Sequence, residues 1–187
     1  QVNAGNTFKN KTVKLAANID LDNKLWTPIG LGESDPKFQG TFDSAATRQG
    51  ECHTISILYI APKRGEYTAA GLFGTLQGVV KNIIIDGAYV EHVTSSNSSG
   101  ATTNGIAVVA GSTYNTAFET SIENVTVKNA TVKGNRMVSA MIGYAQSAVK
   151  NCHIEDITLI ATPDNLSNGY DNGDKVGGFI GVGTHNN

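Results

Sequence analysis

Two carboxylates, Asp86 and Glu155, are the residues whose type and spacing first suggest catalysis. Glycoside hydrolysis needs two carboxylates, about 5–5.5 Å apart in retaining enzymes and about 6.5–9.5 Å apart in inverting ones. A sequence repeat places both residues in one outward-facing column, roughly 9–10 Å apart. Lys128 falls between them in that column, so its charge would keep both carboxylates ionised and leave no general acid. We therefore interpret the column as a surface salt-bridge ladder and not as a catalytic pair.

The histidines form no catalytic or metal-binding set. His53 and His153 fall in or beside expected strands, while His92 and His185 fall in expected loops. None has a metal-ligand spacing to another His or to a Cys. His153 follows Cys152, but alternate residues of a strand point to opposite faces, so these two cannot form a dyad. We predict no catalytic residue, no enzymatic activity and no required cofactor.

Residues 162–174, TPDNLSNGYDNGD, gather oxygen ligands that suit a hard cation such as calcium, with Asp171 and Asp174 as the first candidates. The spacing of an EF-hand is not present, and the alternative is a solvated loop rich in turn residues. An aromatic ring in this loop, that of Tyr170, could stack on a sugar. The loop is a speculative binding site made of Asp164, Asn168, Tyr170, Asp171, Asn172 and Asp174.

The elements that position these residues repeat along the chain. When Asn82, Asn124 and Asn151 are aligned, apolar residues coincide two positions before each Asn and one, three, six and eight positions after it. Within each run they recur at every second position, which is the period of a strand. A short aliphatic run closed by glycine precedes each copy or begins a new one: GLFG ending at Gly74, VVAG at Gly111, AMIG at Gly143 and GFIG at Gly181.

The spacing of the copies predicts the fold. Asn124 follows Asn82 by 42 residues, Asn151 follows Asn124 by 27, and Ile57, aligned with the Asn in an earlier copy, precedes Asn82 by 25. A unit of about 25 residues with loop insertions predicts an all-β parallel solenoid, in which each rung buries its inner face against its neighbours. Five residues after each Asn stands a residue that tolerates a left-handed backbone, so the strand is expected to bend there: Gly87, Asn129 and Asp156.

Stacked rungs would also order the polar side chains. The aligned asparagines predict a structural ladder of interior amides, hydrogen-bonded from rung to rung. Two outward columns would alternate in charge, about 4.8 Å per rung. One column holds Lys81, Glu123 and Lys150, and the other holds Asp86, Lys128 and Glu155.

The organisation expected is a single β-helix domain over 1–187, with irregular N-terminal rungs or a cap over 1–50 and regular rungs over 51–187. Short strands are expected at Val13–Leu15, Asn18–Leu21 and Phe38–Phe42. We interpret Trp26 as a cap over the first rungs, with a sugar-stacking platform as the alternative.

Composition excludes several partners. A formal net charge of −2 argues against nucleic acid or an anionic membrane, because both need a basic face. No apolar run approaches about 18 residues, so no membrane span is expected. Cys52 and Cys152 would lie about three rungs apart and are predicted to be free thiols. The sequence shows no leader and no terminal capping element, so we expect a piece of a longer polypeptide with further domains, or a last strand covered by an oligomer contact.

The segments GLFG…VKNIIIDGAYV and AMIG…VKNCHIEDITL resemble the GLUG-type repeats of bacterial surface proteins, including the non-catalytic region of immunoglobulin-A-cleaving metalloproteases. IDLDNKLWTPIG followed by FQGTFD…HTISILYI is similar to the segment before such repeats in cell-surface proteins of gut anaerobes. The resemblance covers roughly residues 10–183. It implies a right-handed parallel β-helix, an extracellular or outer-membrane-anchored location and adhesion. No H-E-x-x-H occurs, so the protease activity does not carry over. The chain departs from the pattern at the insertion SAATRQGEC and at Ile57.

The function expected is that of a non-catalytic cell-surface module. It would bind a glycan or a host or other extracellular protein through corner loops stacked along one edge, at 61–69, 95–105 and 162–174, with only a short link at 133–136. Two alternatives remain open: a polysaccharide-active enzyme, either lyase or glycosidase, on the same scaffold, and a rigid structural stalk.

Overall fold

The computed structural model describes residues 1–32, 34–44, 52–94, 105–114, 119–162 and 175–184. In this part of the chain the fold is all-β, apart from one short 3-10 turn, η1 (Val2–Ala4). The strands form three sheets, of ten, four and three strands, and every strand pair is parallel. The prediction of an all-β fold is confirmed.

Each sheet collects strands from different parts of the sequence. The four-stranded sheet contains β6 (Phe73–Leu76), β10 (Ala110–Thr113), β13 (Ile142–Ala145) and β17 (Ile180–Gly183). The three-stranded sheet contains β9 (Ile106–Ala107), β12 (Val138–Ser139) and β16 (Val176–Gly177). The ten-stranded sheet contains β1 (Thr12–Leu15), β2 (Ile19–Asp20), β3 (Thr41–Ser44), β4 (His53–Ser56), β5 (Tyr59–Ile60), β7 (Val79–Asp86), β8 (Tyr89–His92), β11 (Ser121–Gly134), β14 (Ala148–Lys150) and β15 (His153–Ala161).

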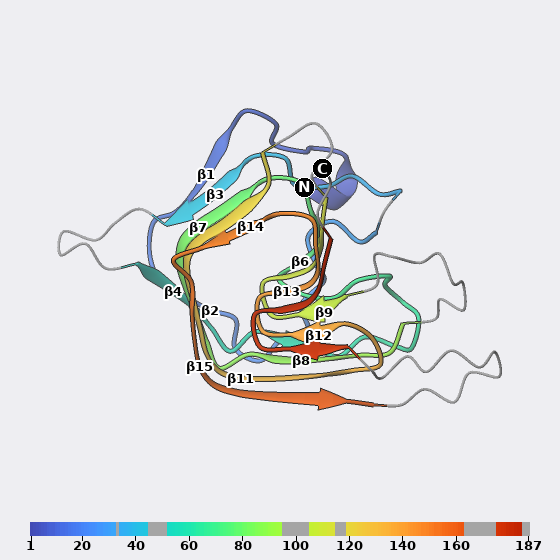
Figure 1. Cartoon of the computed structure of the whole chain (residues 1–187). Helices are drawn as coiled ribbons and strands as arrows, with labels where there is room; N and C mark the ends of the chain where they lie inside the picture. The colour runs from blue at the N-terminus through green and yellow to red at the C-terminus, as the bar shows by residue number, and fades with distance from the viewer. Residues whose placement is uncertain (33, 45–51, 95–104, 115–118, 163–174, 185–187) are drawn as a thin grey trace.

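From β6 onward the chain visits the sheets in a fixed order: the four-stranded sheet, then the ten-stranded sheet, then the three-stranded sheet, and then the four-stranded sheet again. We call one such circuit a passage. Figure 1 shows the strands of successive passages lying one behind another around a shared interior. Paired residues lie 27 positions apart between Glu123 and Lys150, and 42 apart between Lys81 and Glu123. These are the spacings predicted between the aligned asparagines, whereas the spacing of 25 depended on Ile57.

A second correction concerns Ile57. The register pairs Ile55 with Ile85 and Ser56 with Asp86, so Ile57 lies beside Gly87 and not in the Asn82 column. Its φ of 57° is left-handed, as are those of the three residues in this column of bends, Gly87, Asn129 and Asp156. The alignment failed because aliphatic alternation looks the same on either side of a bend. Asp43 pairs with Lys81 and His53 pairs with Ile83, so the described residues Ser44 and Cys52 follow and precede these partners of the strand on either side of Asn82.

The glycines that close the GLFG-type runs stand in one column, because Phe73 pairs with Ala110, Ala110 with Ile142 and Ile142 with Ile180. A Cβ on Gly143 would lie 2.4 Å from the Cα of Gly105, and a Cβ on Gly74 would lie 2.3 Å from the carbonyl oxygen of Gly30. These contacts are with backbone, which cannot move aside. The motif therefore records a close approach between neighbouring segments.

The core lies between the three sheets and consists of inward side chains stacked in columns. Val80 and Ile122 are fully buried, as are the equivalent Ile85 and Val127. The expected strand at Val13–Leu15 lies in β1 and the one at Asn18–Leu21 contains β2. The third expected strand begins later than predicted, at Thr41, while Phe38 forms an isolated bridge with Leu76.

Candidate functional site: an aromatic pocket and the outer columns

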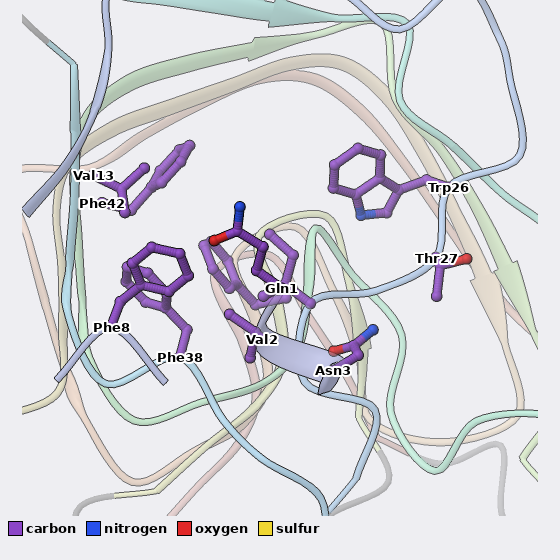
Figure 2. A pocket seen from close by; sticks show the side chains of 11 residues that line it. Gln1, Val2, Asn3, Phe8, Val13, Trp26, Thr27, Phe38 and Phe42 are labelled. Carbon is purple, nitrogen blue, oxygen red and sulfur yellow. The ribbon is translucent and has the colours of Figure 1, made fainter. Parts of the chain in front are cut away.

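A pocket of about 290 Å³ opens beside η1, where the first strands of the chain leave the interior accessible (Figure 2). Five of its eleven lining residues are aromatic, and none carries an ionisable side chain. The aromatic members are Phe8, Trp26, Phe38, Phe42 and Phe73. Such a lining can bind an apolar or flat surface, and its side chains include no titratable group for acid–base chemistry.

The sheets hold the phenylalanine rings in contact. Phe42 lies in β3, Phe73 in β6, and their ring centroids are 5.8 Å apart at 76°. Phe38 lies 5.5 Å from Phe73 and 5.9 Å from Phe8. Edge-to-face and tilted contacts at these distances are favourable beyond simple burial. The rings therefore form a rigid wall on one side of the pocket.

Hydrogen bonds fix the opposite side. The indole N–H of Trp26 donates to the carbonyl oxygen of Leu72 at 3.1 Å, and the Asn3 side chain bridges Pro28 and Gly30. The side chain of Gln1 extends between the two sides in Figure 2. Trp26 packs against the core, as a cap would, and it also lines the pocket. Sequence reasoning singled out Trp26 but missed the four phenylalanines, because three of them come from the irregular first 50 residues.

The outer surface of the ten-stranded sheet carries the charged columns. The register pairs Lys81 with Glu123 and Glu123 with Lys150, and the Lys150 ammonium lies 3.4 Å from the Glu123 carboxylate. The same column contains two earlier residues that were not predicted: Lys14 lies opposite Asp43, and Asp43 lies opposite Lys81. Five charges thus alternate without a break. The hydroxyl of Ser121 and then the Lys150 ammonium lower the pKa of Glu123.

The second column brings Asp86, Lys128 and Glu155 into register, with Asp86 3.3 Å from Lys128. Asn129 donates to Asp86 at 2.8 Å, and this bond, followed by Lys128, lowers the pKa of the Asp86 carboxyl. An ionised, paired carboxylate is a poor general acid. A third pair, Glu91 with Lys133, was missed although both residues stand nine positions after an aligned Asn.

The three asparagines do form a column, but the column lies on the outer surface of the ten-stranded sheet and not in the interior. Asn124 donates to Asn82 at 2.9 Å, and Asn82 donates in turn to Asp43 at 2.7 Å. Asn124 and Asn151 are exposed, so the expectation of interior amides was wrong. The φ angles of the three asparagines lie between 50° and 56°. Asn suits these corners because its side chain tolerates the left-handed backbone and can bond along the column.

The remaining candidates are scattered or lie outside the described residues. The candidates outside the described residues are Asp164, Asn168, Tyr170, Asp171, Asn172, Asp174 and His185. Most of the two longer corner loops, 95–105 and 162–174, also lies outside the described residues. The third corner loop, 61–69, is described, and its Tyr67 carbonyl forms a hydrogen bond of 2.7 Å with His92. His92 is buried, and this burial lowers its pKa. Within the described ranges, no three His, Cys, Asp or Glu side chains gather as a metal site would require.

Cys52 and Cys152 are free thiols, and burial raises the pKa of both. Among the described residues, no helix is long and apolar enough to cross a membrane. Comparisons with protein-family models, with curated proteins and with solved structures give no match to this chain. The class that the described residues define is therefore an all-β chain of parallel sheets with an aromatic pocket and charged outer columns.

Proposed function

We propose that the chain is a right-handed parallel β-helix of the GLUG-repeat type and serves as a non-catalytic binding module of an exported bacterial protein. The fixed order in which the chain visits the three parallel sheets supports the β-helix. The closing glycines and the corner asparagines, which stand in register, support a repeat of this type. Adhesion to a glycan or to an extracellular protein is the role that follows.

The observation that carries the binding role is the pocket lined by aromatic rings and by no ionisable side chain. A sugar ring has a flat face of C–H groups, which packs against aromatic rings, and hydroxyls at its edge that need polar partners. Trp26 and Phe42 offer such rings on two sides of the pocket, and the Gln1 amide between them offers a donor and an acceptor (Figure 2). A glycan is therefore the proposed ligand.

The charged columns favour binding over catalysis. A glycosidase needs one protonated and one ionised carboxyl facing a common cleft. Lys128 lies between Asp86 and Glu155 in register, and the pKa of Asp86 is lowered. This surface is a ladder of paired charges, and ladders of this kind hold neighbouring strands together.

The test uses the single tryptophan of the chain. Trp26 is the only tryptophan, so its fluorescence reports directly on the pocket. The chain is first screened on a glycan array with and without calcium, and the bound glycans are then titrated while the fluorescence of Trp26 is recorded. We expect a spectral shift that saturates with the glycan.

Calorimetry with variants completes the test. Trp26→Ala should weaken glycan binding about tenfold or more, a loss typical of an aromatic anchor. Leu25→Ala is the matched control, because Leu25 is 60% exposed and does not line the pocket. If no glycan binds, or if Trp26→Ala and Leu25→Ala bind equally well, the pocket is not the site.

A further inference from the structure

A titratable side chain, that of His92, is buried where strand β8 ends. His92 is 1% exposed, and its Nε2 atom lies 2.7 Å from the carbonyl oxygen of Tyr67 in the corner loop 61–69. A carbonyl oxygen can only accept, so Nε2 carries the hydrogen and donates it. The histidine therefore ties the corner loop to the end of the strand.

The other ring nitrogen of His92, Nδ1, is buried and has no hydrogen-bond partner among the described residues. In the neutral ring Nδ1 is an acceptor. In the protonated ring it becomes a second N–H donor on a positively charged group, and a buried charge without a partner is far more costly than a buried lone pair. The site therefore suits the neutral ring and disfavours the charged one.

Apolar groups surround the ring on its other sides. The residue opposite His92 in β11 is Gly134, and the fully buried side chain of Ile106 fills the space where a Cβ of Gly134 would lie. The ring of Tyr67 packs 6.2 Å from that of His92. This burial lowers the pKa of His92, against smaller opposing effects of the Tyr67 carbonyl and of Glu66.

Charged groups around this corner do not offset a buried cation. Glu66, in the loop, favours the protonated ring, but its side chain is exposed and its effect is smaller than that of burial. Glu91, next to His92 in β8, points outward and pairs with Lys133. The remaining charged side chains of residues 61–69, β8, β9 and 133–136 are cations: Lys63, Arg64 and Arg136.

The corner loop connects this site to the aromatic pocket. On one side the Gly65 N–H donates to the carbonyl oxygen of Val93 at 2.9 Å, beside the bond between His92 and Tyr67. On the other side the Tyr67 hydroxyl hydrogen-bonds to Thr27, which lines the pocket. A change at His92 can therefore reach the pocket wall through one short loop.

We propose that His92 is a pH switch: the neutral ring holds the corner loop 61–69 against the end of β8, and the protonated ring leaves its buried site and releases the loop. A released ring meets water and has the ordinary histidine pKa of about 6.5. The pKa in the closed state is lower, so the released state binds the proton more tightly. Release is therefore favoured as the pH falls below about 6.5, and above that value the loop stays closed.

The inference rests on the contacts of the loop and does not depend on what the pocket binds. Nuclear magnetic resonance of the 187-residue chain tests it by following the His92 ring between about pH 7.5 and pH 4.5, on either side of the ordinary histidine pKa. Hydrogen exchange is measured at two amides near the two ends of this range. The Gly65 amide reports on the loop, and the Tyr89 amide, which donates to Leu58, reports on the sheet.

Linkage allows at most a tenfold change in the opening equilibrium for each pH unit below about 6.5. We therefore expect the protection factor of Gly65, which corrects for the intrinsic pH dependence of exchange, to fall about tenfold or more between about pH 7.5 and pH 5. His92 should take up its proton over the same range. The protection of Tyr89 should not change.

Two matched variants assign the effect to one histidine. His92→Gln keeps an N–H that can donate to the Tyr67 carbonyl but cannot titrate, so Gly65 should stay protected at both pH values. His53→Gln makes the same change at a half-buried histidine that begins β4, and it should leave the pH dependence intact. Far-ultraviolet circular dichroism checks that both variants fold.

Four results would overturn the proposal: equal protection of Gly65 at both pH values, a parallel loss at Tyr89, a pH dependence that persists in His92→Gln, or one that disappears in His53→Gln. A parallel loss at Tyr89 would indicate general acid unfolding. Should His92→Gln not fold, the unmodified chain still decides, because loss of Gly65 protection out of step with the protonation of His92 also refutes the switch.

Discussion

The corner asparagines combine two roles that substitutions can separate. Asn124 has a φ of 50° and donates to Asn82 at 2.9 Å. Asn151 has a φ of 51°, yet its side chain has no hydrogen bond within the described residues. Asn151 is thus a matched control that shares the backbone conformation without the ladder bond.

Magnitudes follow from these two contributions. Placing alanine in a left-handed conformation costs roughly 1–2 kcal/mol, and an exposed amide hydrogen bond contributes about 0.5–1 kcal/mol. Asn124→Ala should therefore lower the free energy of unfolding by about 2 kcal/mol and Asn151→Ala by about 1.5 kcal/mol or less. Glycine removes the left-handed penalty, so Asn124→Gly and Asn151→Gly should differ by the side-chain bonds of Asn124, chiefly the ladder bond to Asn82 with a longer contact to the Cys52 sulfur, about 0.5–1 kcal/mol.

Urea unfolding of the four variants, followed by far-ultraviolet circular dichroism, measures these differences. The order expected, from most to least destabilised, begins with Asn124→Ala and ends with Asn151→Gly. The reasoning fails if Asn124→Gly is as destabilised as Asn124→Ala, because the left-handed backbone would then contribute nothing. Equal stability of Asn124→Gly and Asn151→Gly would instead show that the ladder bond has no value.

Three further changes test other parts of the fold. Gly143→Ala should destabilise by about 3 kcal/mol or more, because its Cβ would lie 2.4 Å from the Cα of Gly105, whereas Gly178→Ala, which meets only a side-chain atom at 3.3 Å, should cost far less; urea midpoints compare the two. Glu123→Lys, flanked by Lys81 and Lys150 in register, should destabilise by about 1 kcal/mol at low ionic strength and less in about 1 M salt, and an effect independent of salt would refute the column. Asp86→Asn should lower stability at neutral pH: the folded pKa of Asp86 is lowered, so its stabilisation is present above the ordinary carboxyl pKa of about 3.9 and is lost as the pH falls through the lowered value. The difference between Asp86→Asn and the unmodified chain should therefore shrink as the pH falls below the ordinary carboxyl pKa and through the lowered pKa of Asp86, and a constant difference would contradict this.

The regular part of the fold was predictable because two independent patterns agree there. Aliphatic alternation locates the strands, and the alternating charges fix which residues face each other, as the pairing of Glu123 with Lys81 and Lys150 shows. At Ile57 only the aliphatic pattern was available, and a shift along it still places aliphatic residues in the interior. The error there was one of register, and no charge stood in the right place to correct it.

The pocket could not be predicted for a different reason. Phe38 and Phe42 contact Phe73, and Phe8 contacts Phe38, because segments far apart in sequence lie side by side, and no spacing in the chain predicts these contacts. The exposed position of the Asn column was also hidden. A residue type that suits a left-handed corner looks the same in sequence whether its side chain points inward or outward.

Apolar columns and charged columns make different contributions to this molecule. Val80 and Ile122 are both fully buried aliphatic residues, so exchanging one passage for another would leave the interior about equally well filled. Exposed ion pairs contribute little stability each, about 0–1 kcal/mol, but their signs are not interchangeable. Stability therefore comes mainly from the buried apolar columns. The charged columns on the outer surface specify the order in which the strands lie side by side.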